Sequence, residues 1–486
     1  MTGTLALVIV AHVPYVRSIG REPAGEDRLH RLLAGGLIPV LRFLADMRER
    51  GTPTPVTFAI APILLEQLAD PIIQKHIVYW LERQIDTHEA AARDPVNSDD
   101  QQSYVREFAI EWTRGLLETF DRRFSRNLVA VIRDLCRYNG ASALASAATH
   151  AYLPLAASAT TVRAQIEIGT LATTRQLDLH PQGFWLPEMG YTPAIERALQ
   201  LAGLRYTIAD PATLVTPGVP TLRPRWTPDR KLAMFFRDVE LGEQVHSHAL
   251  GYPGDPLYRA ESDAARARGG TGYDPYHAFR RANEHGAHFV AALAASLGRF
   301  AQRHDRPGIA VVPVDLALVG GQWFEGPIWL RAIVEQLATA EAPAALTTLD
   351  SYLTRYRPRQ VATLRAASWG PGGDHHLWEE PRALVLRRAI AAAEQRLDHI
   401  VRRFPDATGD QERVLAQALR EVLLAQSSTW QEQDADPQRA YTHLGRFDRL
   451  YEAAELRAAG DVRALLDDLE ERDNPFATLN YRSFAA

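Results

Sequence analysis

Short, almost continuously apolar runs alternate with helical patterns through the first three quarters of the chain. The runs are TLALVIVAH (4–12), PVTFAIAP (55–62), GFWLPE (183–188), RYTIAD (205–210), KLAMFFRD (231–238) and GIAVVPVD (308–315). Strands that are buried on both faces of a parallel sheet have this pattern, whereas helices recur with a period of 3.6 residues. The alternation predicts an α/β fold around a parallel sheet, either a barrel or an open sheet.

Two regions are helical and contain little strand pattern. Residues 65–140 predict a helical insertion between strands, and residues 379–486 predict a C-terminal helical bundle that packs on the α/β unit. The α/β unit itself is then formed by residues 1–64 and 141–378. The glycine-rich segment AARARGGTGYDP (264–275) is expected to be a mobile surface loop.

Composition narrows the classes of protein that remain. The chain has 486 residues, of which 46% are hydrophobic and 23% charged, and its formal net charge of −5 gives no argument for nucleic acid or an anionic membrane as partner. No apolar stretch approaches the 18 residues of a membrane span. The first apolar run has no basic residues before it, which does not fit a secretory signal. Because Cys136 is the only cysteine, we expect a cytoplasmic protein without a disulfide.

Three of these apolar runs end in His12, Glu188 and Asp315, which are polar residues of a type that takes part in catalysis. In parallel α/β folds, chemistry collects at the carboxyl ends of the strands. Glu188 stands in the apolar and aromatic stretch GFWLPEMGY, where a charge is costly unless it is paired, hydrogen-bonded or used. A glutamate that merely starts a helix is the alternative interpretation.

A pair of carboxyl groups such as Glu188 and Asp315 is what glycoside hydrolysis requires. Asp315 is followed by a Gly-Gly turn and by the aromatic residues Trp323, Phe324 and Trp329. Aromatic rings suit the C–H faces of sugars, although core packing is the more common role of such residues. The pairs HSH (246–248) and HH (375–376) are weak metal signals, because no carboxylate follows them at an established spacing.

Four motifs, taken together, resemble glycoside hydrolase family 57, and most closely its 1,4-α-glucan branching enzymes. They are AATHAYLPL (147–155), GFWLPEMGY (183–191), PVDLALVGGQWFEGPIWL (313–330) and ASWGPGGDHHLW (367–378). AHVPYVR (11–17), GYPGDPLYR (251–259) and ERDNPF (471–476) resemble further motifs of the same group. The resemblance implies a (β/α)7 barrel with a helical insertion and a C-terminal α-helical domain.

The resemblance also implies the chemistry. It assigns Glu188 as the nucleophile and Asp315 as the general acid/base of a retaining reaction on α-1,4-linked glucan, in which a glucosyl-enzyme is resolved by a 6-hydroxyl. No metal or other cofactor is implied. The residues expected to contact the sugar are His12, His150, Trp185, Trp323, Trp369, His375 and Trp378.

Departures from the family pattern leave alternatives open. Val10 replaces a histidine of the first motif, and Ala317, Gly321 and Gln322 replace a glutamate, a histidine and a tryptophan after Asp315. The segment 211–231 is short and contains no tyrosine. In the branching enzymes that the chain resembles, a loop with a tyrosine in this region covers the intermediate and keeps water away from it. An α-glucan hydrolase, a 4-α-glucanotransferase and a decayed glucan-binding protein are therefore the competing hypotheses.

Overall fold

A barrel of seven parallel strands forms the centre of the molecule. The computed structural model describes residues 3–18, 24–93, 100–259, 272–431 and 437–484, and every structural statement here concerns these residues. Around the barrel the strands are β9 (Gly308–Asp315), β1 (Gly3–Ala11), β2 (Thr57–Ile60), β3 (Ser142–Ala143) continued by β4 (Ala145–Ser146), β5 (Gly183–Trp185), β6 (Tyr206–Ala209) and β8 (Ala233–Phe236). A parallel bridge between Arg237 and Val311 closes the ring. The predicted (β/α)7 barrel is thus confirmed.

Alternation along β1 separates the two sides of the barrel wall. Leu5, Leu7 and Ile9 pack outward against helices, whereas Ala6, Val8 and Val10 belong to a second buried cluster together with side chains of the other strands. Successive residues of a strand point to opposite faces, so this second cluster fills the barrel interior. Both sets are buried, which explains why the sequence runs are apolar throughout. Two short strands, β7 (Arg225–Trp226) and β10 (Ala345–Leu346), extend the sheets.

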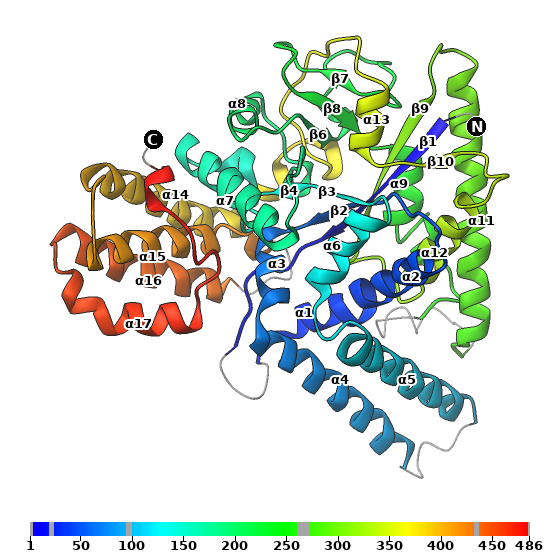
Figure 1. Cartoon of the computed structure of the whole chain (residues 1–486), viewed down its shortest axis with the longest axis horizontal. Helices are drawn as coiled ribbons and strands as arrows, with labels where there is room; N and C mark the ends of the chain where they lie inside the picture. The colour runs from blue at the N-terminus through cyan, green and yellow to red at the C-terminus, as the bar shows by residue number, and fades with distance from the viewer. Residues whose placement is uncertain (1–2, 19–23, 94–99, 260–271, 432–436, 485–486) are drawn as a thin grey trace.

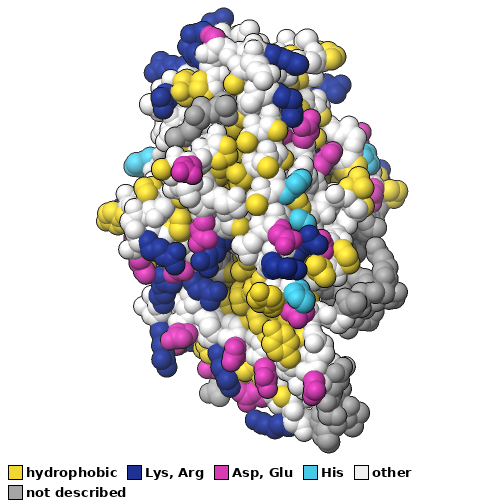
Figure 2. All heavy atoms as spheres, turned by 90° about the vertical axis from the view of Figure 1, so that its right-hand side faces the viewer, with side chains coloured by type: hydrophobic (Ala, Val, Ile, Leu, Met, Phe, Trp, Pro, Cys, Tyr) yellow, Lys and Arg dark blue, Asp and Glu magenta, His cyan; other side chains and the backbone are white. Residues whose placement is uncertain are grey.

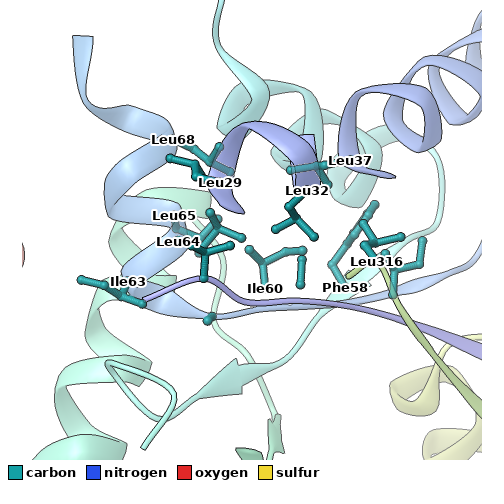
Figure 3. Packing of buried hydrophobic residues seen from close by; sticks show 14 of the residues in the cluster. Leu29, Leu32, Leu37, Phe58, Ile60, Ile63, Leu64, Leu65, Leu68 and Leu316 are labelled. Atoms are coloured by element: carbon teal, nitrogen blue, oxygen red, sulfur yellow. The ribbon is translucent and has the colours of Figure 1, made fainter. Parts of the chain in front are cut away.

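Helices surround the barrel (Figure 1). They are α1 (Asp27–Arg31), the π-helix η1 (Leu32–Leu37), α2 (Ile38–Glu49), α3 (Pro62–Ala69), α7 (Ala159–Leu177), α8 (Pro193–Leu201), α9 (Val239–His246), α11 (Pro275–Ala301), α12 (Gly326–Leu337) and α13 (Leu349–Arg355). Figure 3 shows leucines of α1 and η1 packed over β2 and α3, with Leu316 in the same cluster. Because Leu316 is fully buried, this packing fixes the end of β9 next to Asp315.

The helical insertion lies between β2 and β3. Its long helices α4 (Pro71–Ala92) and α5 (Asp100–Glu118) form a hairpin that projects from the barrel in Figure 1, and η3 (Thr119–Arg123) and α6 (Leu128–Tyr138) return the chain to it. The Asp70 carboxylate accepts a hydrogen bond from Ile72 N at 2.7 Å and so caps the start of α4. The exact boundaries assigned to the insertion remain predictions.

C-terminal helices pack together on the side of the barrel opposite α11 (Figure 1). They are α14 (Pro381–Arg403), α15 (Asp410–Ala425), η10 (Ser428–Gln431), α16 (Gln438–Glu455), η11 (Ala459–Val462), α17 (Arg463–Arg472) and η12 (Tyr481–Phe484). Most of the predicted loop 264–275 lies outside the described residues. None of the described helices combines the length and the hydropathy that crossing a bilayer requires.

A buried polar network joins the C-terminal helices to the barrel. Gln426 Nε2 donates to Glu394 Oε1 at 2.8 Å, and its Oε1 accepts from Gln165 Nε2 at 2.8 Å. Gln165 in turn accepts from Thr149 N at 3.1 Å, directly before His150. Burial raises the pKa of Glu394 to about 7, against the hydrogen bonds that favour its charged form. The network therefore connects α14 to the end of β4 through a titratable group.

We predict that Glu394→Gln flattens the pH dependence of stability. The folded chain binds the proton of the Glu394 carboxyl group more tightly than the unfolded chain does. The stability gained from this protonation is complete below about pH 4.5 and is lost as the pH rises through about 7. The total loss is up to about 3 kcal/mol. Urea unfolding at pH 5 and pH 8 measures the effect. The wild type should lose more stability than the variant across this interval, and Glu452→Gln, at an exposed position, should behave like the wild type. Parallel curves for wild type and Glu394→Gln would contradict the assignment.

Candidate active site

Glu188 stands in a strained turn at the carboxyl end of β5. The turn is the 3-10 segment η5 (Pro187–Met189), in which Glu188 and Met189 have φ of 55° and 49°. Left-handed backbone is unfavourable for residues other than glycine and persists where the surroundings hold it. Here Tyr191 and Ala367 exchange backbone hydrogen bonds of 2.9 and 3.1 Å, which fix the turn to the segment before Trp369.

The Glu188 carboxylate accepts hydrogen bonds from two residues that lie far away in the sequence. Trp369 Nε1 donates to Oε2 at 3.0 Å, and the Ser428 hydroxyl donates to Oε1 at 3.4 Å. The side chain of Glu188 is only 13% exposed. Donors of this kind stabilise a carboxylate in its charged form, which is the form that acts as a nucleophile.

Two stacked imidazoles flank the same carboxylate. The rings of His12, just after β1, and His150, just after β4, are 3.9 Å apart and nearly parallel. His12 Nε2 and His150 Nδ1 lie 4.0 and 3.8 Å from Glu188 Oε1. Burial, with the charges of His12 and Arg28, holds the pKa of His150 well below its usual range. Since the Ser428 hydroxyl gives its proton to Glu188, its oxygen accepts from His150 Nδ1 at 2.9 Å, and His150 is a neutral donor.

His12, His150 and Glu188 also place potential metal-ligand atoms within 4.8 Å of one another. Two imidazoles and a carboxylate are a donor set that zinc accepts. Glu188 and His150 are, however, both hydrogen-bonded to Ser428, and Glu188 is also hydrogen-bonded to Trp369. The resemblance described above implied that His12 and His150 contact the sugar at this site, and it implied no metal ion.

Asp315 lies at the end of β9, beside the first strand. The register of β1 and β9 pairs Val10 with Asp315, two residues before His12, so Asp315 and His12 reach the same edge of the barrel. Asp315 Oδ1 accepts from Ala317 N at 2.9 Å. Burial lowers the pKa of His246, and the charge of Asp315 opposes this effect. The His246 ring is also 6.0 Å from the ring of Trp369, which is hydrogen-bonded to Glu188. His246 therefore lies near Asp315 and near a partner of Glu188.

Tyr152 joins the last motif to the site. Its hydroxyl lies 2.6 Å from His375 Nδ1, and its ring stacks on Trp378 with centroids 4.6 Å apart. A Cβ on Gly190 would lie 2.5 Å from the Tyr152 ring, so only glycine allows the turn after Glu188 to approach it. Tyr152 thereby holds His375 and Trp378 against the Glu188 turn.

Of the tryptophans expected to contact sugar, Trp185 and Trp323 are the most deeply buried. Trp185 is 1% exposed in the barrel interior, where its ring meets that of Trp369 edge to face at 5.8 Å. Trp323 is 2% exposed and packs between Trp329 and Tyr258. Neither ring offers an open face to a ligand, whereas Trp369 is partly exposed.

Sequence reasoning missed Ser428 and His246 as parts of this site. Ser428 comes from η10, in the region assigned to the C-terminal bundle, and nothing in its neighbourhood marks it as functional. His246 belongs to the HSH triplet, which was considered only as a weak metal signal. Tyr152 lies inside a motif that was identified, but its role as a link to His375 was not predicted.

Comparison with known proteins identifies relatives of this chain. The model of glycosyl hydrolase family 57 matches residues 7–365, and the model of the 1,4-alpha-glucan branching enzyme C-terminal domain matches residues 389–484. The 1,4-alpha-glucan branching enzyme TK1436 of Thermococcus kodakarensis is 31% identical over 98% of this chain and 78% of its own length. A probable 1,4-alpha-glucan branching enzyme of Mycobacterium tuberculosis is 27% identical, over 99% of this chain and 98% of its own length.

Solved structures show the same fold. The GH57-type branching enzyme of Pyrococcus horikoshii superimposes with a TM-score of 0.92 at 29% identity, covering 100% of this chain and 97% of the other. The α-amylase AmyC of Thermotoga maritima superimposes with a TM-score of 0.88 at 24% identity over 100% of this chain and 99% of its own, a likeness of fold alone. The match of the family model to most of the chain, together with the 31% identical relative, shows that the chain belongs to glycosyl hydrolase family 57.

Proposed function

We propose that the chain is a retaining 1,4-α-glucan branching enzyme. The observation that carries this proposal is the Glu188 carboxylate, held by Trp369 and Ser428 beside two stacked imidazoles at the carboxyl end of a family 57 barrel. The match of residues 389–484 to a branching-enzyme domain favours transfer to a 6-hydroxyl over other reactions of the family.

Glu188 is the proposed nucleophile. Its oxygen attacks the anomeric carbon of an α-1,4-linked glucosyl unit, and the bond to the leaving 4-oxygen breaks as the glucosyl-enzyme forms. Trp369 Nε1 and the Ser428 hydroxyl keep the carboxylate charged and aimed. His12 and His150, which lie 4.0 and 3.8 Å from Glu188 Oε1, are proposed to form hydrogen bonds with sugar hydroxyls; His150 accepts through Nε2, because its Nδ1–H already donates to Ser428. The neutral state of His150 fits this role, because it adds no competing charge.

Asp315 is the proposed general acid and base. It gives a proton to the leaving oxygen and later removes one from the 6-hydroxyl of the acceptor, which then attacks the glucosyl-enzyme and releases Glu188. The Ala317 backbone N–H orients one carboxyl oxygen of Asp315. Burial lowers the pKa of the neighbouring His246, and the charge of Asp315 raises it by a smaller effect. Only these two carboxyl groups are needed, and we keep the prediction that no metal ion takes part.

Trp369, His375 and Trp378 are the proposed contacts to the donor sugar. Trp185 and Trp323 are instead proposed to support the site from the core, because their rings are almost fully buried. The substrate class is α-glucan, and the proposed location remains the cytoplasm. The short segment 211–231 favours hydrolysis as the second candidate, since transfer requires water to be excluded.

We predict that purified protein converts α-1,4 into α-1,6 linkages in amylose without releasing reducing ends. Proton NMR counts both linkages and the reducing ends over time. Glu188→Gln should lower the rate by more than about 1,000-fold, because a neutral amide cannot form the glucosyl ester. Reducing ends without α-1,6 signals would identify a hydrolase. New α-1,4 chain lengths without either change would identify a 4-α-glucanotransferase, and binding without turnover a decayed site.

Azide separates the roles of the two acids. With Asp315→Ala and a substrate that carries a good leaving group, azide should attack the accumulated glucosyl-enzyme and give the α-glucosyl azide, with retained configuration. With Glu188→Ala, azide enters the vacated space directly and should give the inverted β-glucosyl azide. NMR coupling constants distinguish the two products. The opposite pairing of variants and products would exchange the assigned roles.

Ser428→Ala tests a positioning residue from the C-terminal helices. Loss of its hydroxyl removes one donor from Glu188 and the partner of His150, so we expect kcat/KM to fall about tenfold. The acid limb of the pH profile should also move to higher pH, because the carboxylate loses a donor that favours its charged form. Ser428→Thr should restore most of the activity. An unchanged profile with reduced stability would leave Ser428 a structural role only.

A further inference from the structure

A groove of about 380 Å³ lies between the helical insertion and the loop that follows Asp315. Its volume falls in the range of small-molecule sites, about 300 to 1,000 Å³. One wall is formed by α4 and α5, which contribute Trp80 and Trp112, and the floor contains Gly320 and Gly321. Nothing in the proposed mechanism uses these residues.

One face of α4 presents a regular stripe to the groove. Trp80, Gln84 and His88 line it at spacings of four residues, which places them above one another on the helix over about 12 Å. All three are partly exposed, and burial together with Arg259 lowers the pKa of His88, so its imidazole is neutral. An aromatic ring, an amide and a neutral imidazole in a row suit an elongated, uncharged, hydroxyl-rich ligand.

Further aromatic rings continue this surface. Phe108, Trp112, Phe279 and Phe324 form a half-buried cluster with ring centroids 5.3 to 6.3 Å apart. Figure 2 shows hydrophobic side chains gathered in the lower half of this face of the molecule. Trp112 and Phe324 also line the groove, so its apolar side is a wall of ring edges and faces.

The floor of the groove depends on two glycines. A Cβ on Gly321 would lie 2.1 Å from Ala317 O, and Gly320, with φ of 107°, packs against the backbone of Gly35. In this conformation the loop therefore has no room at position 321 for the histidine of the family pattern. Gly321, one of the positions that depart from the family pattern, is part of the groove lining beside α4.

The loop that forms the floor of the groove follows Asp315 in the sequence. Val319 N donates to Asp315 O at 2.8 Å, one residue before the glycine floor. Gln322 Oε1 lies 3.2 Å from His248 Nε2, two residues after His246. On the other side, Arg31 lines the groove one turn beyond Arg28, whose charge acts on His150.

We propose that this groove is a binding site for the α-glucan chain beyond the units held at Glu188, with the α4 stripe as its recognition surface. The inference rests on the proposed function and adds a preference for long chains. Trp80 stacks on a glucosyl face, and Gln84 and His88 bind its hydroxyl groups.

Binding to the Glu188→Gln variant tests the groove without turnover. Isothermal titration with maltotriose and with an amylose fragment of about 20 glucosyl units gives an affinity ratio of long to short chain. Adding Trp80→Ala should lower this ratio about tenfold, Gln84→Ala should lower it less, and Trp80→Phe should retain most of it. Glu82→Ala, on the exposed face of α4, is the matched control and should leave the ratio unchanged.

The outcomes separate this proposal from the function on which it rests. An equal ratio in Trp80→Ala and in its parent overturns the groove while leaving the catalytic proposal intact. An equal loss for both chain lengths also overturns it, because Trp80 would then act on the fold or on the sugar at Glu188. If the Glu188→Gln parent binds neither ligand, the proposed function fails first. Thermal unfolding of each variant confirms that it folds.

Discussion

The hydrogen bonds to the Glu188 carboxylate are the constraint on which the rest of the site depends. A carboxylate that is 13% exposed, in a turn of Pro187, Glu188 and Met189, loses much of its hydration. Hydrogen bonds from Trp369 and Ser428 replace part of the lost hydration of the carboxylate. These residues lie 181 and 240 positions later in the chain. The barrel, its last loop and the C-terminal helices must all be in place before this charge is held. Folding and chemistry therefore share the same contacts.

Much of the fold could be predicted because burial leaves a clear pattern in the sequence. The apolar runs of β1 and β9 read as strands, since both of their faces pack against other layers. The strand formed by β3 and β4 was missed, because its residues Ser142–Ala143 and Ala145–Ser146 are small and have low β-propensity. It is a strand because Leu144 N donates to Phe58 O, a tertiary contact that no local pattern encodes.

The site was predictable to the extent that it lies at strand ends within motifs. His12, Glu188 and Asp315 end predicted strands, whereas His150 was identified only through its motif, and the structure groups Glu188 with both histidines. Ser428 could not be found in this way, because a serine in a helical region has no distinguishing signal. Trp185 and Trp323 are almost fully buried, and an aromatic residue in a motif can be there for the core that supports the site.

The departures around Asp315 are better explained as a rearrangement than as decay. The hydrogen bond from residue 317 to Asp315 comes from its backbone N–H, so it survives the replacement of a glutamate by Ala317. Gln322 contacts His248, and Gly321 permits a tight loop whose carbonyls and amides are paired within it. A decayed site would be expected to lose the strained backbone at Glu188 as well, because no function would then favour a conformation that destabilises the fold. The strain is retained and the loop is tightly packed, which argues for an active site with altered surroundings.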